Sequence, residues 1–234
     1  MAGRPPLHLY PLGAGTCNFF GGTDGAIRMD KSTVKIVVGT RNEGKVAELR
    51  GLLGGAPVCL VSLAEFGDLP EVEETGKTFA ENAAIKAKSY AELTGHWAVA
   101  DDSGLEVAAL GGEPGVRSAR YAGKGASDAE NMAKLLSKLK NFVENERAAC
   151  FVCEMAVAHP SGEIVFRSRG TCPGHITRNP LGVNGFGYDP VFVPTGFNRT
   201  FGELPDNVKA GISHRSAASE KIVDFLARFF GPTT

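Results

Sequence analysis

The stretch that decides the fold is VKIVVGTRNEGKVAELRGLL, residues 34–53. Residues 34–39 are a short apolar run rich in β-branched side chains, which predicts a buried strand. Residues 46–53 have the apolar spacing of a helix and stop at a pair of glycines. A strand joined to a helix by a short loop is typical of the first unit of an α/β protein.

The loop between this strand and this helix carries groups that bind phosphate. It ends at a helix N-terminus, where free backbone N–H groups and the helix dipole favour an anion. Thr40 and Asn42 add neutral donors, and Lys45 adds a cation. The spacing of the glycines and Lys45 also matches most of a Walker A loop, but Val46 stands where that loop needs Ser or Thr for its metal. We therefore expect phosphate binding without a P-loop; the alternative is an ordinary turn with a surface lysine.

Two capping boxes mark helices further along the chain. Thr78-Phe-Ala-Glu81 opens a long helix that is closed by Gly95, and Ser127-Asp-Ala-Glu130 opens a second helix. The remaining expected elements are strands at residues 58–63, 97–100, 148–158 and 163–176, the last two joined as a hairpin, and a helix at about residues 216–230. This order predicts an α/β fold with a mixed sheet.

Two adjacent carboxylates, Asp101 and Asp102, come directly after the short strand expected at residues 97–100, and residues 105–110 continue as a strand or turn. Neighbouring side chains on a strand point to opposite faces, so we expect one carboxylate to face a cleft and the other to be structural. Carboxylates suit Mg²⁺ and the activation of a water molecule. Residues 71–74 hold three more acids and predict a second source of metal ligands, with a solvated acidic loop as the equally weighted alternative.

Two motifs in the last third of the chain suggest a base platform and an anion clamp. In Gly185-Phe-Gly-Tyr-Asp-Pro190 the glycines let the ring of Phe186 approach a ligand face, although a core plug at a bend has the same composition. Lys209, His214 and Arg215 precede the last expected helix. Cations are disfavoured at a helix N-terminus unless an anion is near, so this cluster predicts phosphate or base contacts, with an exposed basic helix start as the alternative.

These motifs resemble a known family. TRNEGK, EETGKTFAENAAIKA, ADDSGLEV, PGVRSARYAG, GFGYDPVF and KAGISHR occur in the order and spacing of the inosine triphosphate pyrophosphatases, also called dITP/XTP pyrophosphatases, over about residues 34–230. The resemblance implies an elongated mixed sheet with flanking helices, two lobes around a substrate cleft, and a homodimer. It implies hydrolysis of ITP, dITP or XTP to the monophosphate and pyrophosphate.

The resemblance also implies roles for individual residues. Asp102 would be the catalytic proton acceptor and, with Glu74, would bind Mg²⁺. Contacts to the substrate would come from Thr40, Asn42, Lys45, Lys86, Ser103, Phe186, Gly187, Tyr188, Asp189, Lys209, His214 and Arg215. Two positions depart from the family pattern: Arg41, which we expect to point to solvent, and Arg117, which stands where an aromatic is common.

Composition places the chain among ordinary globular proteins. It has 234 residues, 43% of them hydrophobic, and a formal net charge of −1, so we expect no nucleic-acid partner and no membrane association. Five cysteines do not suggest a disulfide framework, which favours a cytoplasmic location; Cys150-Phe-Val-Cys153 lies in a strand-like run and predicts core packing. Residues 34–234 are expected to form one two-lobed domain.

Residues 1–33 differ from the remainder, being rich in glycine and proline without a clear period. We expect a flexible or loosely packed arm, or an artefact of cloning or of the assigned start site, since Met29 lies just before the organised pattern. The main alternative function is a non-catalytic nucleotide sensor on the same fold, which would not need both Glu74 and Asp102. A P-loop ATPase and a nucleic-acid binder are less compatible with Val46 and with the neutral charge balance.

Overall fold

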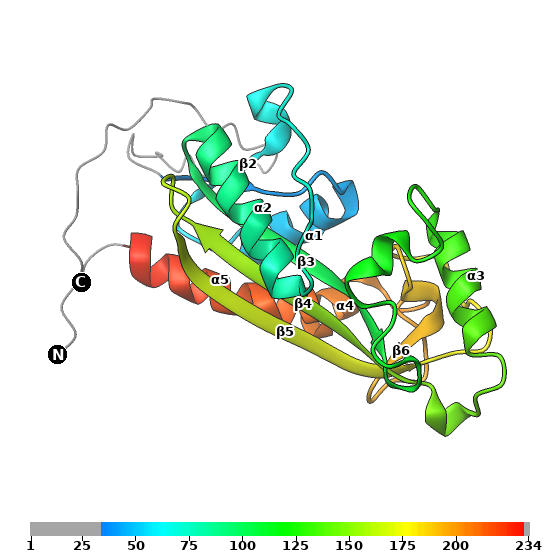
Figure 1. The fold of residues 1–234 in the computed structure, drawn as a ribbon. Helices are drawn as coiled ribbons and strands as arrows, with labels where there is room; N and C mark the ends of the chain where they lie inside the picture. The colour runs from blue at the N-terminus through cyan, green and yellow to red at the C-terminus, as the bar shows by residue number, and fades with distance from the viewer. Residues whose placement is uncertain (1–33, 232–234) are drawn as a thin grey trace.

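The computed structural model describes residues 34–231, so the predicted arm at residues 1–33 lies outside the described part of the chain. A six-stranded sheet runs through the molecule in the order β2-β1-β3-β4-β5-β6 (Figure 1). The strands are β1 (Lys35–Val38), β2 (Cys59–Ser62), β3 (Trp97–Val107), β4 (Ala148–Ala158), β5 (Ile164–Ile176) and β6 (Phe192–Pro194). β1 pairs in parallel with β2 and β3, and the remaining pairs are antiparallel. The predicted α/β fold with a mixed sheet is confirmed.

Five α-helices flank this sheet in the described residues. They are α1 (Glu43–Leu53), α2 (Phe79–Thr94), α3 (Asp128–Lys138), α4 (Asp206–Ile212) and α5 (His214–Phe230). Both predicted capping boxes form, at Thr78 with Glu81 and at Ser127 with Glu130, so Glu81 serves as a capping acid. The short helix α4 was not predicted: it has seven residues, too few for a clear period, and it ends at Ser213, which also caps α5.

The sheet is covered on both faces at the end that contains β1 and β2. Alternate residues of β1 divide between the faces: Ile36 and Val38 pack with α1 and α5, whereas Val37 packs with α2. The α2 face is lined by alanines from the helix and from the sheet, which lets the helix backbone approach closely. This packing fixes α1 and α2 on opposite sides of the strand that carries the two aspartates.

The three long strands β3, β4 and β5 continue from this end of the molecule to a second core (Figure 1). That core joins Leu105 of β3 to Leu135 of α3, to Phe151 of β4 and to Phe192 of β6. It is separate from the two clusters that cover the β1 end of the sheet. The middle of β3, with both aspartates, therefore lies between two hydrophobic cores.

The expectation that a strand ends before Asp101 was wrong, because β3 continues without a break to Val107. The antiparallel ladder with β4 holds this stretch, pairing Asp101 with Met155 and Asp102 with Glu154. β1 pairs only with residues 97–99 of β3, and no described strand lies beside residues 101–104 on that edge. The site thus lies where β1 stops and leaves one edge of β3 without a neighbouring strand. It does not lie at the end of β3 itself.

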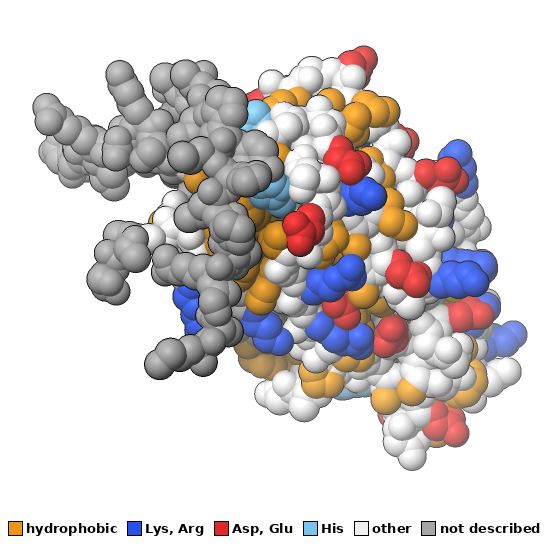
Figure 2. All heavy atoms as spheres, turned by 60° about the vertical axis from the view of Figure 1, so that its left-hand side comes forward, with side chains coloured by type: hydrophobic (Ala, Val, Ile, Leu, Met, Phe, Trp, Pro, Cys, Tyr) orange, Lys and Arg blue, Asp and Glu red, His pale blue; other side chains and the backbone are white. Residues whose placement is uncertain are grey.

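The structure also bears on the expectations about membrane association, cysteine packing and surface charge. None of the helices within residues 34–231 is long and apolar enough to span a bilayer. Cys150 and Cys153 lie on β4 as free thiols. Core packing is confirmed for Cys153, which is fully buried, whereas Cys150 is only partly buried. On the described surface visible in Figure 2, acidic and basic side chains are interspersed without a broad patch of one sign.

Candidate active site

A pocket of about 260 Å³ opens beside the unpaired edge of β3. Its walls come from the loop before α1, from α2, from the loop that precedes α2, from residues 186–189 and from the junction of α4 and α5. The structure brings every predicted site residue to this pocket: Thr40, Asn42, Glu74, Lys86, Asp102, Ser103, Phe186, Gly187, Tyr188, Asp189, Lys209, His214, Arg215 and Lys45. Segments separated by more than a hundred residues in sequence therefore meet around one cavity.

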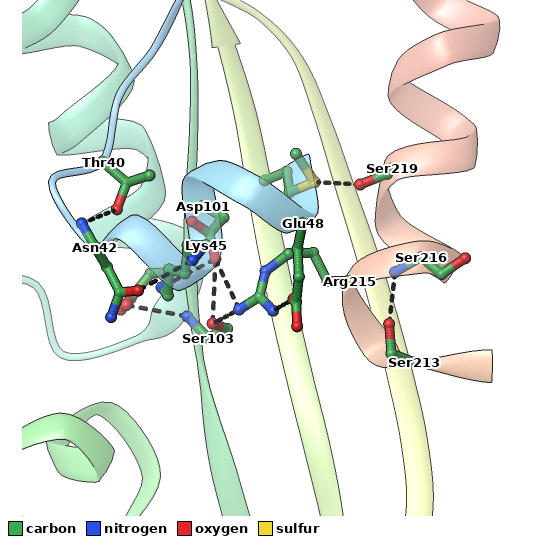
Figure 3. Close-up of polar contacts among 12 residues, drawn as sticks. Thr40, Asn42, Lys45, Glu48, Asp101, Ser103, Ser213, Arg215, Ser216 and Ser219 are labelled. Carbon is green, nitrogen blue, oxygen red and sulfur yellow. Dashed lines mark hydrogen bonds and ion pairs between the residues drawn. The ribbon is translucent and has the colours of Figure 1, made fainter. Parts of the chain in front are cut away.

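The first turn of α1 forms one wall. Asn42 is the N-cap of the helix, and its side-chain oxygen accepts a hydrogen bond from the backbone N–H of Lys45 at 3.0 Å. The hydroxyl of Thr40 accepts from the backbone N–H of Asn42 at 3.2 Å (Figure 3). These bonds fix the loop, so the positive end of the helix dipole faces the pocket.

The two aspartates point to opposite faces of β3, as predicted. Asp101 is fully buried on the α1 side, where its Oδ2 lies 3.0 Å from the ammonium of Lys45. Burial favours the neutral acid, yet Lys45 and Arg215 hold the pKa of Asp101 well below its usual range. Asp102 lines the pocket on the α2 side. Asp101 is thus the structural carboxylate of the pair.

On the α2 side, Lys86 lies between two carboxylates. Its ammonium is 2.7 Å from Glu74 and 3.6 Å from Asp102. Burial raises the pKa of Asp102, although the charge of Lys86 opposes the shift. Burial alone would lower the pKa of Lys86, but the charges of Asp102, Asp101 and Glu74 together raise it above its usual value. The pocket therefore holds two acidic groups around one buried cation.

Asn82 also belongs to this group, and the sequence reasoning missed it. It is fully buried on α2, and its side-chain amide donates to Oδ2 of Asp102 at 3.0 Å. Its side-chain oxygen accepts from the backbone N–H of Gly76 at 2.8 Å. The signal was present in the sequence, because Asn82 and Lys86 are four residues apart and so share one face of a helix.

A chain of alternating charges runs behind the pocket from Lys45 on α1 to Asp189, and Figure 3 shows its first part, from Lys45 to Glu48. Asp101 contacts Lys45 and Arg215, and Arg215 also contacts Glu48. Glu48 continues the chain to Lys209, whose ammonium lies 2.7 Å from Glu48 and 2.7 Å from Asp189. Glu48 was not predicted, although its position three residues after Lys45 places both on one face of α1.

The chain of alternating charges accounts for the cations around the junction of α4 and α5. Lys209, His214 and Arg215 are all buried, so the alternative of an exposed basic helix start is wrong. Burial alone would lower the pKa of Lys209, but the charges of Asp189 and Glu48 raise it above its usual value. Burial and the neighbouring charge of Arg215 lower the pKa of His214 well below its usual value, so the imidazole is neutral. Its ring stacks on Phe151 at 4.7 Å.

The ring of Phe186 lies against α1. A Cβ atom added to Gly44 would lie 3.0 Å from this ring, so any larger residue there would press against it. The ammonium of Lys209 is 4.7 Å from the ring centroid. The backbone N–H of Phe186 donates to Asp189 at 2.9 Å, which holds the ring in the pocket wall. The Tyr188 hydroxyl donates to the backbone oxygen of Ser118 and anchors the same loop.

The two departures from the family pattern have different positions. Arg41 does not simply point to solvent: its guanidinium donates to the backbone oxygen of Leu69, and it lines the pocket. The side chain is exposed, as expected, but the loop before α2 lies beside the phosphate-binding loop and offers it a carbonyl. Arg117 lines a different cavity, together with the glycine-rich turn before it. Arg120, which was not predicted, reaches Glu74 at 3.5 Å.

The donor set of the pocket fits a hard divalent cation. Within residues 34–231 no cluster of three or more acidic, histidine or cysteine ligands forms, so a cage made of protein groups is absent from the described chain. Mg²⁺ is usually held by one or two carboxylates together with phosphate oxygens and water. Glu74 and Asp102 supply two such carboxylates, and the ammonium of Lys86 between them shows that the geometry attracts positive charge.

Comparisons with known proteins agree with this geometry. The sequence profile of the Ham1 family matches residues 36–225. A dITP/XTP pyrophosphatase of Exiguobacterium sibiricum is 48% identical over 198 residues, which cover 85% of this chain and 100% of that protein. The structure of a HAM1 protein from Coxiella burnetii has a TM-score of 0.77 at 42% identity, covering 84% of this chain and 100% of that one. A Mycobacterium abscessus structure described as a nucleoside-triphosphatase / dITP/XTP pyrophosphatase has a TM-score of 0.67 at 46% identity, covering 81% and 98%.

Proposed function

The chain belongs to the Ham1 family, and on that premise we propose that it hydrolyses noncanonical purine nucleoside triphosphates such as dITP, ITP and XTP to the monophosphate and pyrophosphate. The observation that carries the proposal is the single pocket that joins a helix N-terminus, two carboxylates and an aromatic ring. A triphosphate needs the first two, and a purine base needs the third.

Asp102 is the proton acceptor in this proposal. It lines the pocket, and its burial raises its pKa, which makes the carboxylate a better base for a water molecule that attacks the α-phosphorus. The backbone N–H of Ser103 donates to Oδ1 at 3.0 Å, and Asn82 donates to Oδ2. The carboxylate therefore keeps one orientation towards the attacking water.

The cations of the pocket bind the phosphates and the leaving pyrophosphate. Lys45, the first turn of α1 and Lys209 all line the pocket. Glu74 and Asp102 would hold Mg²⁺, which would neutralise phosphate charge and polarise the phosphorus centre when bound. Lys86 keeps the two carboxylates together in the absence of the metal and contributes positive charge near the phosphates.

Selection of the base follows from donors near Phe186. Two lining residues, His214 and Arg215, each carry a buried side-chain nitrogen without a hydrogen-bond partner among the described groups. A donor directed at the 6-oxygen of hypoxanthine or xanthine meets another donor, the amino group, in adenine. Mismatched buried polar groups cost about 1–3 kcal/mol, which corresponds to roughly tenfold to hundredfold discrimination.

The homodimer that the resemblance implies and the cytoplasmic location that the cysteine content favours stay predictions. So does the single two-lobed domain at residues 34–234. Light scattering on the purified protein measures the oligomeric state directly, and we expect twice the mass of one chain.

A substrate panel tests the proposed function. Pyrophosphate release is measured with ITP, dITP, XTP, ATP and GTP, each with Mg²⁺ and with excess EDTA. We expect release from the first three, at least about tenfold slower release from ATP, and no release in EDTA. Guanine shares the 6-oxygen, so the rate with GTP measures whether the 2-amino group is selected against as well.

Two results would contradict the proposal and favour other functions. Tight binding of ITP without turnover of any nucleotide would favour the non-catalytic sensor. Release of orthophosphate from ATP would favour an ATPase. Equal rates with and without EDTA would remove the metal from the account while leaving the pyrophosphatase activity in place.

A further inference from the structure

We propose that Asn82 is a positioning residue that locks the Asp102 carboxylate to the loop carrying Glu74, so that the two acidic groups keep one relative arrangement. The inference rests on the proposed function, because it assigns Asn82 a part in the same hydrolysis. Asn82 touches neither the reacting atoms nor the pocket surface, so it acts through Asp102.

The hydrogen-bond partners determine which way the Asn82 amide faces. The backbone N–H of Gly76 can only donate, so the side-chain oxygen of Asn82 must accept from it at 2.8 Å. The NH₂ group is then left to face Oδ2 of Asp102, 3.0 Å away. An NH₂ group can only donate here, so Oδ2 of Asp102 accepts this hydrogen bond and the direction of the contact is fixed.

The approach of the acidic loop to Asn82 is closely packed. A Cβ atom on Gly76 would lie 2.6 Å from the side-chain oxygen of Asn82 and 2.7 Å from Cβ of Glu81, so glycine permits the contact. Glu81 itself caps α2 and bonds the backbone N–H groups of Lys77 and Thr78. Residues 76–78 are thus fixed to the helix, and Glu74 stands two residues before them.

Asn82 is also fully buried, with no solvent to replace a lost partner. Asp102 receives a second donor, the backbone N–H of Ser103, on Oδ1. Removing the Asn82 amide therefore leaves Oδ2 without this donor and frees the carboxylate to rotate. A group that orients a catalytic or metal-binding carboxylate in this way typically accounts for about 10- to 100-fold in activity or metal affinity.

Two variants separate the two bonds of Asn82. Asn82→Ala removes both bonds, whereas Asn82→Asp keeps an acceptor for Gly76 and replaces the donor to Asp102 with an oxygen. We expect kcat for ITP to fall about 10- to 100-fold in both variants, the KM for ITP to stay within about threefold, and the Mg²⁺ concentration for half-maximal rate to rise. Hydrogen exchange at the Gly76 amide should quicken in Asn82→Ala and stay near wild type in Asn82→Asp.

Asn131 offers a matched control. It is a buried asparagine on α3 that likewise links its helix to a preceding loop, accepting from the N–H of Ala122 and donating to the oxygen of Ala119, without contact to Asp102. We expect Asn131→Ala to lower thermal stability as Asn82→Ala does, while kcat stays within about threefold of wild type.

The outcomes distinguish this inference from the proposed function. An inactive wild-type enzyme would overturn the proposed function, and the role of Asn82 in it. An active wild type with folded Asn82 variants at wild-type kcat would overturn the inference alone. A loss of kcat in Asn82→Ala that Asn82→Asp restores would also overturn it, because the donor to Asp102 would then be dispensable.

Discussion

An Asp102→Asn enzyme is expected to turn over ITP at least about 100-fold more slowly than wild type while its KM for ITP changes by less than about threefold. The side chain keeps its shape, but an amide cannot accept the proton of the attacking water. Lys45, the first turn of α1 and Phe186 are unaffected, so binding of the nucleotide persists. Steady-state kinetics, with ITP binding measured by calorimetry in EDTA, check both halves of the prediction.

Glu154 provides the control for this substitution. It stands directly opposite Asp102 in the ladder between β3 and β4, and its carboxylate pairs with Arg169 at 3.1 Å outside the pocket. We expect Glu154→Gln to keep kcat within about twofold, since an ion pair of this kind contributes little. Wild-type kcat in Asp102→Asn, or equal losses in the two variants, would contradict the role of Asp102.

An Asp101→Asn protein is expected to lose about 3–5 kcal/mol of its free energy of unfolding at neutral pH, because Lys45 and Arg215 then lie near a buried neutral group. Asp102→Asn, beside it, should stay within about 1 kcal/mol of wild type. Denaturant unfolding followed by circular dichroism gives both values. The Asp101→Asn substitution should thus reduce stability, whereas the Asp102→Asn substitution should reduce turnover.

The pH dependence of this difference follows from the lowered pKa of Asp101. A carboxylate with a folded-state pKa below its unfolded value stabilises the protein above the unfolded pKa, and the stabilisation declines as pH falls towards the folded pKa. The difference in free energy of unfolding between wild type and Asp101→Asn should therefore be at its maximum at pH 7 and should shrink below about pH 4. A gap that is absent at pH 7, or that widens in acid, would contradict the structural role of Asp101.

Much of the fold could be predicted from local patterns. The strand and helix of residues 34–53, the two capping boxes and the hairpin at residues 159–162 all depend on nearby residues, and each forms. The opposite orientation of Asp101 and Asp102 also follows from strand geometry. These features need no knowledge of the rest of the chain.

The features that were missed depend on contacts between distant segments. Asp101 and Asp102 can continue in β3 because β4 pairs with them and cations from α1, α2 and α5 neutralise them. Glu48 gains its role from Lys209 and Arg215, more than a hundred residues later. Asn82 shares a helix face with Lys86 in the sequence, but its link between Gly76 and Asp102 exists only once the fold brings those two residues beside it.

The most direct test of the central claim is the position of the bond that breaks. ITP is hydrolysed with Mg²⁺ in water labelled with heavy oxygen, and the products are identified by mass spectrometry. We predict equal amounts of monophosphate and pyrophosphate, with the label on the monophosphate, because water activated by Asp102 attacks the α-phosphorus. Formation of IDP and orthophosphate, or label on the pyrophosphate, would contradict the account.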